Sequence, residues 1–111
     1  MSTPSFLTST TETIAGYEIA EVIGVARGNV IRAKHVGTDF IAALRNVVGG
    51  EVREYTKLMA EAREQAFDRM VANARAMGAD AVVAMRFQTA MVMAGSAEML
   101  AYGTAVRLVR R

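Results

Sequence analysis

The chain lacks most of the side chains that carry covalent and metal chemistry. Its 111 residues include no cysteine, no tryptophan, one proline and one histidine. The absence of cysteine excludes disulfides, thiolate nucleophiles and thiolate metal ligands. The single histidine, His35, leaves little scope for imidazole chemistry. The chemistry open to this chain therefore rests on arginines, carboxylates, tyrosines and methionine thioethers.

Long apolar runs and blocks of one charge are missing as well. No apolar run approaches the roughly 18 residues of a membrane span, and the N-terminus has no basic region followed by an apolar one. Eleven arginines and two lysines are opposed by 11 acidic residues, and the basic residues are scattered along the chain. We therefore expect a cytoplasmic protein with no membrane partner and no nucleic-acid partner.

The familiar catalytic motifs are absent from the sequence. It contains no GxSxG, no HExxH and no phosphate-binding loop. The pair Gly49-Gly50 follows no strand and precedes no Lys-Ser/Thr pair, so it is interpreted as a helix end. The carboxylates of Glu61, Glu64 and Asp68 share one polar helix sector, which is typical of a solvated surface. We therefore expect a protein that is not an enzyme.

One stretch dominates the chain, residues 51–77, between Gly49-Gly50 and Gly78. It contains no proline or glycine, and its apolar residues recur at steps of three and four. This pattern predicts a single helix about 40 Å long, at ~1.5 Å per residue. Its apolar residues cover about 220° of the helix surface, whereas packing on one sheet needs only about 100°. We expect a second subunit to cover the remainder.

One charged residue, Arg63, lies inside the apolar arc of this helix, with Met59 and Phe67 one turn to either side. Two interpretations are open. The side chain can pack its stem on apolar surface and hold its guanidinium in solvent. Alternatively, the guanidinium is buried and must pair with a carboxylate. Asp39, Asp80 or a glutamate of a neighbouring subunit could supply that carboxylate.

The segments on both sides of the helix have strand patterns. Residues 6–10 predict a short strand, and residues 81–89 and 98–109 predict a hairpin closed by a turn at 94–96. Several side chains in the hairpin are expected to share faces: Val83, Met85 and Phe87 inward, with Arg86 and Gln88 outward, and Leu100, Tyr102, Val106 and Leu108 together.

The segment from residue 17 to residue 34 also has the pattern of a strand. Strict alternation predicts two faces from residue 17 onward: Ile19, Glu21, Ile23 and Val25 on one, and Ala20, Val22 and Gly24 on the other. Gly28-Asn29 then interrupts the pattern, as either a tight hairpin turn or a bulge in one long strand. The bulge is favoured because the apolar alternation resumes at once in residues 30–34.

The order of these elements predicts the fold class. Thr38 or Asp39 can cap a short helix over residues 40–48, which precedes the long helix. Strand, two helices and a hairpin predict an α+β fold: an antiparallel sheet packed on one long helix plus a short helix, in two layers. The chain length fits a single domain over residues 1–111. The apolar content of 52% leaves surplus apolar surface, which again favours association of subunits.

Methionines gather in the predicted hairpin. Met91, Met93 and Met99 lie close together in sequence, and thioethers are soft ligands that suit Cu(I). Met91, Met93 and His35 are therefore candidate metal ligands. Methionine is also the adaptable filler of cores and association surfaces, so packing between subunits is the alternative.

Three runs within residues 41–86 resemble the YbjQ-like family of small uncharacterised proteins: LRNVVGGEVREYT, EAREQAFDRM and ARAMGADAVVAMRF. The N-terminal GYEIAEVIGVARGNVIRAKHVGTD extends the resemblance over nearly the whole chain. It implies a dodecin-like α+β subunit that forms homo-pentameric rings or pairs of rings. The family carries a heavy-metal-binding label and no established reaction. Tyr55, Arg63 and Asp80 match the family pattern and are candidate ligand-binding or interface residues.

These observations predict a cytoplasmic homo-oligomer, a pentameric ring or a pair of them, that binds a small ligand or metal ion at its subunit interfaces. The alternative is a structural or assembly protein with no ligand. The sequence does not identify a cofactor.

Overall fold

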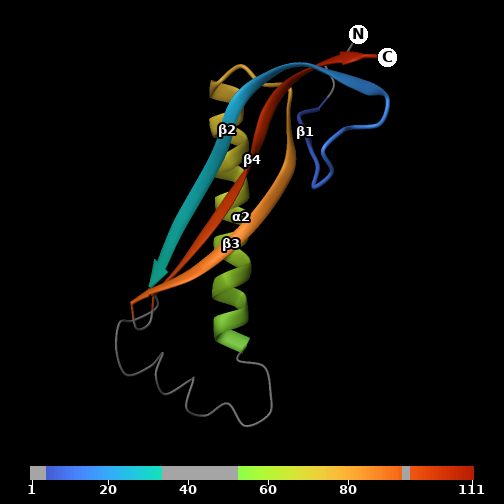
Figure 1. Ribbon diagram of the computed structural model, residues 1–111. Coiled ribbons are helices and arrows are strands. Elements are labelled where there is room, and N and C mark those ends of the chain that lie inside the picture. The colour runs from blue at the N-terminus through green and yellow to red at the C-terminus, as the bar shows by residue number, and fades with distance from the viewer. Residues whose placement is uncertain (1–4, 34–52, 94–95) are drawn as a thin grey trace.

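The computed structural model describes residues 5–33, 53–93 and 96–111. The elements in chain order are β1 (Leu7–Thr8), β2 (Tyr17–Ala33), α2 (Arg53–Ala76), β3 (Ala81–Met93) and β4 (Ser96–Arg110). A four-stranded sheet in the order β1-β3-β4-β2 lies against the single long helix α2 (Figure 1). The predicted α+β fold is confirmed. The short helix predicted over residues 40–48 lies outside the described residues.

The sheet is antiparallel except at one edge. β2 pairs with β4 and β3 pairs with β4 in antiparallel orientation, so the predicted hairpin is confirmed. β1 pairs in parallel with the start of β3 and is shorter than the strand predicted over residues 6–10. Because β1 is so short, most of β3 lies at an edge of the sheet, and β2 forms the opposite edge along its whole length.

The long helix ends as its sequence predicts. Gly78 adopts a left-handed conformation, with φ of 86°, directly after the last helical turn. The Ala79 N–H donates to the Ala74 carbonyl at 3.1 Å, and the Gly78 N–H donates to the Arg75 carbonyl at 3.0 Å. This pair of bonds is the Schellman motif, which satisfies carbonyls that the helix end would otherwise leave free.

Small residues bring α2 very close to the sheet. Three alanines, Ala62, Ala66 and Ala74, are fully buried on the same helix face as Met70, and the four residues recur every four positions. At Gly28 of β2, a Cβ atom would lie 2.3 Å from the Met70 backbone nitrogen and 2.4 Å from the Ala66 carbonyl oxygen. The helix backbone therefore rests directly on the strand backbone at Gly28, and only glycine fits there.

The helix does not lie over the middle of the sheet. α2 packs on β2 and β4 and makes few contacts with β3. Phe87 and Met91 of β3 pair with Ala101 and Ala97, two buried residues of β4. Phe87 is nevertheless 41% exposed and Met91 59% exposed, because α2 does not reach over this part of β3.

β2 is one continuous strand, as favoured by its sequence, but its irregularities lie elsewhere than predicted. The register with β4 shifts between Ile19 and Glu21 and again between Val22 and Gly24, whereas Gly28-Asn29 pairs regularly. The two shifts bring Ile19, Val22 and Val25 opposite alternate residues of β4, namely Leu108, Val106 and Thr104. These three apolar residues therefore share one face. The strict alternation predicted from residue 17 onward is wrong, because each bulge reverses the sides of the residues beyond it.

The N-terminal segment covers one end of the helix-free face. Leu7 and Ile14 pack with Leu108 against a small buried cluster of Ala81, Val83 and Val106. A bulge at Ala84, with φ of 54°, separates Val83 from Met85, which packs in the helix-side core. The prediction that Val83 shares a face with Met85 and Phe87 is therefore wrong for Val83.

Candidate functional site

Asp80 lies at the turn between α2 and β3 and forms hydrogen bonds with two other strands. Its Oδ2 accepts a hydrogen bond from the Leu108 N–H at 2.8 Å. Its own N–H donates to the Val106 carbonyl at 2.9 Å, and its carbonyl accepts from the Leu7 N–H at 3.5 Å. Asp80 thereby ties together the starts of β1 and β3 and the end of β4.

Arg63 lies on the side of α2 turned away from β2. It is one turn before Phe67 and about 120° around the helix from Arg69, which reaches β2. Arg63 is exposed and forms no salt bridge within the part of the chain that the structure describes. Among the described residues, Arg63 therefore forms no ion pair with Asp80, and Asp39, the other candidate partner in this chain, lies outside the described residues. Tyr55 lies in the first turns of α2, and its side chain is outside the described atoms.

The proposed metal ligands are not brought together by the described residues. Met91 is 59% exposed on β3, the side chain of Met93 is not described, and His35 lies outside the described residues. Within residues 5–33, 53–93 and 96–111 there is no group of three or more His, Cys, Asp or Glu residues that could hold a metal ion. Met99, in contrast, is buried in the helix-side core.

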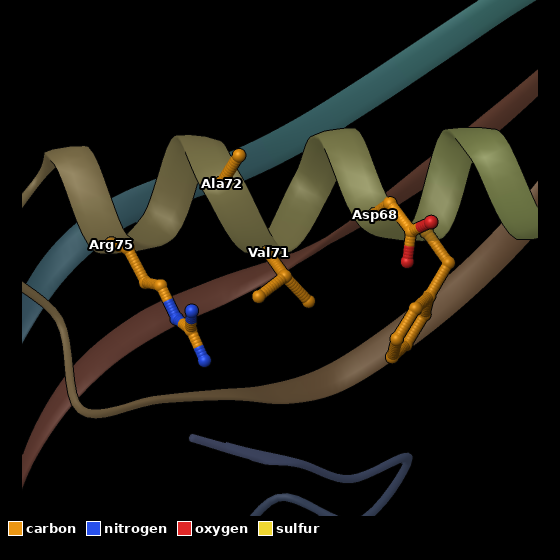
Figure 2. A pocket seen from close by; sticks show the side chains of 5 residues that line it. Asp68, Val71, Ala72 and Arg75 are labelled. Carbon is orange, nitrogen blue, oxygen red and sulfur yellow. The ribbon is translucent and has the colours of Figure 1, made fainter. Parts of the chain in front are cut away.

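A groove of about 530 Å³ runs along α2, lined by Phe67, Asp68, Val71, Ala72 and Arg75. Figure 2 shows Asp68, Val71 and Arg75 projecting from the helix into this region. The carboxylate and the guanidinium are seven residues apart, about 10 Å along the helix axis, with apolar side chains between them. The Arg75 guanidinium also lies 5.3 Å from the centre of the Phe6 ring, a cation–π contact with the N-terminal segment. The groove thus offers opposite charges on either side of an apolar floor.

A strip of exposed apolar residues follows β2 on the helix-free face. We call these four residues the β2 strip: Ile19, Val22, Val25 and Ile31. Val22 and Val25 are each 64% exposed, and Ile31 is 58% exposed. The sequence pattern missed this strip because strict alternation assigns Val22 and Val25 to opposite faces. A spacing of three between Ile19, Val22 and Val25 was the available signal for bulges.

Charged residues on the helix-free face are mainly arginines. Arg27, Tyr102 and Arg86 stand opposite one another on β2, β4 and β3. The Arg86 Nη1 donates to the Thr10 carbonyl at 3.0 Å and to its neighbour's carbonyl, Met85, at 2.8 Å, which fixes the N-terminal segment. At the far end of the face, the hydrogen bond to the Tyr17 hydroxyl raises the pKa of Arg110.

Comparison with known proteins covers nearly the whole chain. A model of the YbjQ family, described as "Putative heavy-metal-binding", matches residues 6–109. The UPF0145 protein of Methanosarcina acetivorans is 60% identical over 103 residues, which cover 93% of this chain and 97% of that protein. The UPF0145 protein of Archaeoglobus fulgidus is 57% identical over 100 residues, covering 90% and 93%. Neither is named as an enzyme.

A solved structure supports the fold. The crystal structure of a protein of unknown function from the DUF74 family of Pediococcus pentosaceus aligns with a TM-score of 0.61 at 15% identity, covering 94% of this chain and 98% of that one. Within the described residues, no helix is long and apolar enough to cross a membrane. With the family model matching almost from end to end and relatives near 60% identity, the chain belongs to the YbjQ family.

Proposed function

We propose that this protein is a cytoplasmic homo-oligomer, a pentameric ring or a pair of such rings, that binds a small ligand or metal ion at its subunit interfaces and catalyses no reaction. The number of subunits follows from the family resemblance. The assembly and the ligand rest on separate features of the molecule.

The β2 strip carries the assembly. Four of the seven exposed large hydrophobic residues in the described chain lie on this one edge strand. A long edge strand that exposes apolar side chains is an association surface unless another element covers it. A contact between this strip and a different surface of the next subunit repeats around a closed ring when the rotation allows it.

The shape of the subunit supports the same proposal. Its radius of gyration is 17.5 Å, with extents of 54 × 25 × 24 Å. A compact domain of this length has a radius of gyration of about 13 Å. An elongated subunit covers less of its own apolar surface, so neighbouring subunits have more to bury.

The groove on α2 supports a small ligand. It is open on one side in the subunit, and a neighbouring subunit would enclose it. Asp68 and Arg75 on either side of Val71 suit a small molecule that carries an apolar body and polar groups of either charge. A heavy-metal ion fits the described donors less well, since cysteine is absent and Met91 is the one proposed ligand whose side chain is described.

The second candidate function is an assembly protein with no ligand. It is favoured by the lack of a metal-binding cluster in the described part of the chain. Both candidates require the same oligomer and differ only in what the oligomer holds.

Val25→Glu is expected to dissociate the ring into a species of one or two chains, each of 11.9 kDa. Val25 is 64% exposed in the subunit, so the fold tolerates the change, whereas an unpaired carboxylate buried in an interface costs several kcal/mol. Sedimentation equilibrium at micromolar concentration measures the mass.

Val109→Glu is the matched control. Val109 is also an exposed valine, 48% exposed, but it lies on β4 opposite Glu18, on the other face of the sheet. This variant should keep the wild-type mass. A wild-type protein that sediments as a single chain would refute the assembly.

Native mass spectrometry separates the two candidate functions. We expect the purified assembly to carry bound small-molecule mass, either as isolated or after addition of nucleotides, Zn(II) or Cu(I). A ligand that enters the groove should be lost from Val71→Arg, which fills the apolar floor, while the assembly persists. Masses equal to bare protein under every condition would favour the assembly protein without a ligand.

A further inference from the structure

The two edges of the sheet differ in which hydrogen-bond partners their outward-facing backbone N–H and C=O groups have. At the middle of β2, the Arg27 N–H donates to Asn73 Oδ1 at 3.0 Å, and the Asn29 carbonyl accepts from Arg69 Nη1 at 2.8 Å. Both partners are α2 side chains that reach across to the outer side of the strand. They occupy the backbone groups that another strand would need, so α2 closes the middle of the β2 edge.

The N-terminal segment closes the first half of the β3 edge. β1 pairs with Ala81 and Val82. Beyond β1, the Ala84 N–H donates to the Thr11 carbonyl at 2.8 Å, and the Met85 N–H donates to the Ser9 carbonyl at 3.0 Å. These contacts end at Met85.

After Arg86, residues 87–91 of β3 form an edge that no described residue covers. Residues 87–91 pair with β4 on one side and have no other hydrogen-bond partner among the described residues. Their sequence is Phe-Gln-Thr-Ala-Met, with no charge and no proline. All five residues are exposed, including the large apolar side chains of Phe87 and Met91. Between Phe87 and Met91 there is no lysine, proline or bulge of the kind that protects an edge strand, although Arg86 precedes the segment and the register with β4 shifts directly after it, between Met91 and Met93.

We propose that residues 87–91 of β3 pair in antiparallel orientation with the same residues of a second copy, around a two-fold axis at Thr89. In this register, Phe87 lies opposite Met91 of the partner subunit, and sulfur–aromatic contacts are favourable. Thr89 lies opposite Thr89 of the partner subunit. Because the segment is uncharged, no like charges meet in the new ladder.

A second copy is the fitting occupant for two reasons. The segment is complementary to itself, since reversing it exchanges its two large apolar residues around a central threonine. The β2 edge of another copy is a poor partner, because Asn73 and Arg69 occupy its backbone groups. The pairing rests on the proposed function only in that the chain assembles with itself. It adds a two-fold contact, separate from the β2 strip, that joins two rings back to back.

Thr89→Cys tests the two-fold axis directly, since the chain has no other cysteine. Facing residues of an antiparallel pair have Cα atoms about 5.5 Å apart, within the range that a disulfide spans. Mild oxidation of the intact assembly should convert most of the protein to a covalent dimer on a non-reducing gel. Gln88→Cys is the matched control, because its equivalents lie about 8 Å apart across the axis, too far for a disulfide.

Substituting Thr89 with a residue of either charge tests whether the β3–β3 contact holds the assembly together. Thr89→Glu and Thr89→Lys should each halve the native mass, because like charges meet at the axis, and mixing the two variants should restore it. Val25→Glu acts on the ring instead and should give single chains or two-fold dimers. Equal cross-linking of Thr89→Cys and Gln88→Cys, or unchanged mass in both charged variants, would overturn the proposal while leaving the ring intact.

Discussion

Gly28→Ala is expected to lower the free energy of unfolding by about 3 kcal/mol, at the upper end of the usual range for overpacking. The added methyl group would lie 2.3 Å from the Met70 nitrogen and 2.4 Å from the Ala66 oxygen, and both are backbone atoms of α2. A side chain can rotate away from such a contact, but a helix backbone must move as a whole. Urea denaturation at one fixed protein concentration measures the loss, since assembly makes the stability concentration-dependent.

Gly103→Ala is the matched comparison for this prediction. Its added methyl group would lie 2.4 Å from Val82 Cγ1, a side-chain atom, with the Val83 oxygen next at 3.0 Å. Val82→Ala should therefore partly relieve Gly103→Ala, giving a favourable coupling energy in a double-mutant cycle. Met70→Ala should give Gly28→Ala no comparable relief. Rescue of Gly28→Ala by side-chain truncation would contradict the backbone contact.

Met70→Ala is expected to cost about 3 kcal/mol, because it leaves a cavity between α2 and the sheet. Met70 is one of the largest fully buried side chains among the described residues. It packs in the core with Met85 and Met99, so these methionines act by filling space. The same urea titration measures the loss.

Met70→Leu is the control for this second prediction. It keeps most of the volume and removes only the sulfur, and such exchanges usually cost less than about 1.5 kcal/mol. If Met70→Leu and Met70→Ala lost the same stability, the thioether rather than the filled volume would matter. That result would reopen a role for buried methionine sulfur in this family.

The position of α2 links these stability predictions to assembly. The close contact at Gly28 seats the helix over β2 and β4, so that β3 keeps Phe87 and Met91 exposed. The same position lets Asn73 and Arg69 reach the outer edge of β2. The position of the helix therefore closes the middle of the β2 edge and leaves residues 87–91 of β3 uncovered by any described residue. The proposed two-fold contact rests on this difference between the two edges.

The candidate site was only partly predictable from the sequence. Asp80 was identified as a notable residue from the family pattern, but its bonds to Leu108 and Val106 depend on β4, which follows 16 or more residues later. Arg63 was identified as the charged residue in an apolar arc, and its exposure in the subunit depends on where α2 sits. The helical pattern places Asp68 on a solvated face, because a helical wheel does not show that Phe67 and Val71 line a groove beside it.

Local elements and the available side-chain chemistry could be predicted from the amino-acid pattern alone. An uninterrupted helical period predicted α2, the hairpin and the α+β class followed from the order of the strands, and the lack of cysteine removed thiolate chemistry. These features depend on neighbouring residues, so a pattern along the chain is enough to show them.

The surfaces that a partner could contact depend on how distant segments of the chain pack together. The bulges that align Ile19, Val22 and Val25 arise from pairing with β4, and the closure of the β2 edge joins residues 40 and 46 positions apart in sequence. The register of the strands and the coverage of the sheet edges depend on contacts between distant segments. The spacing of apolar residues along the chain does not reveal these contacts.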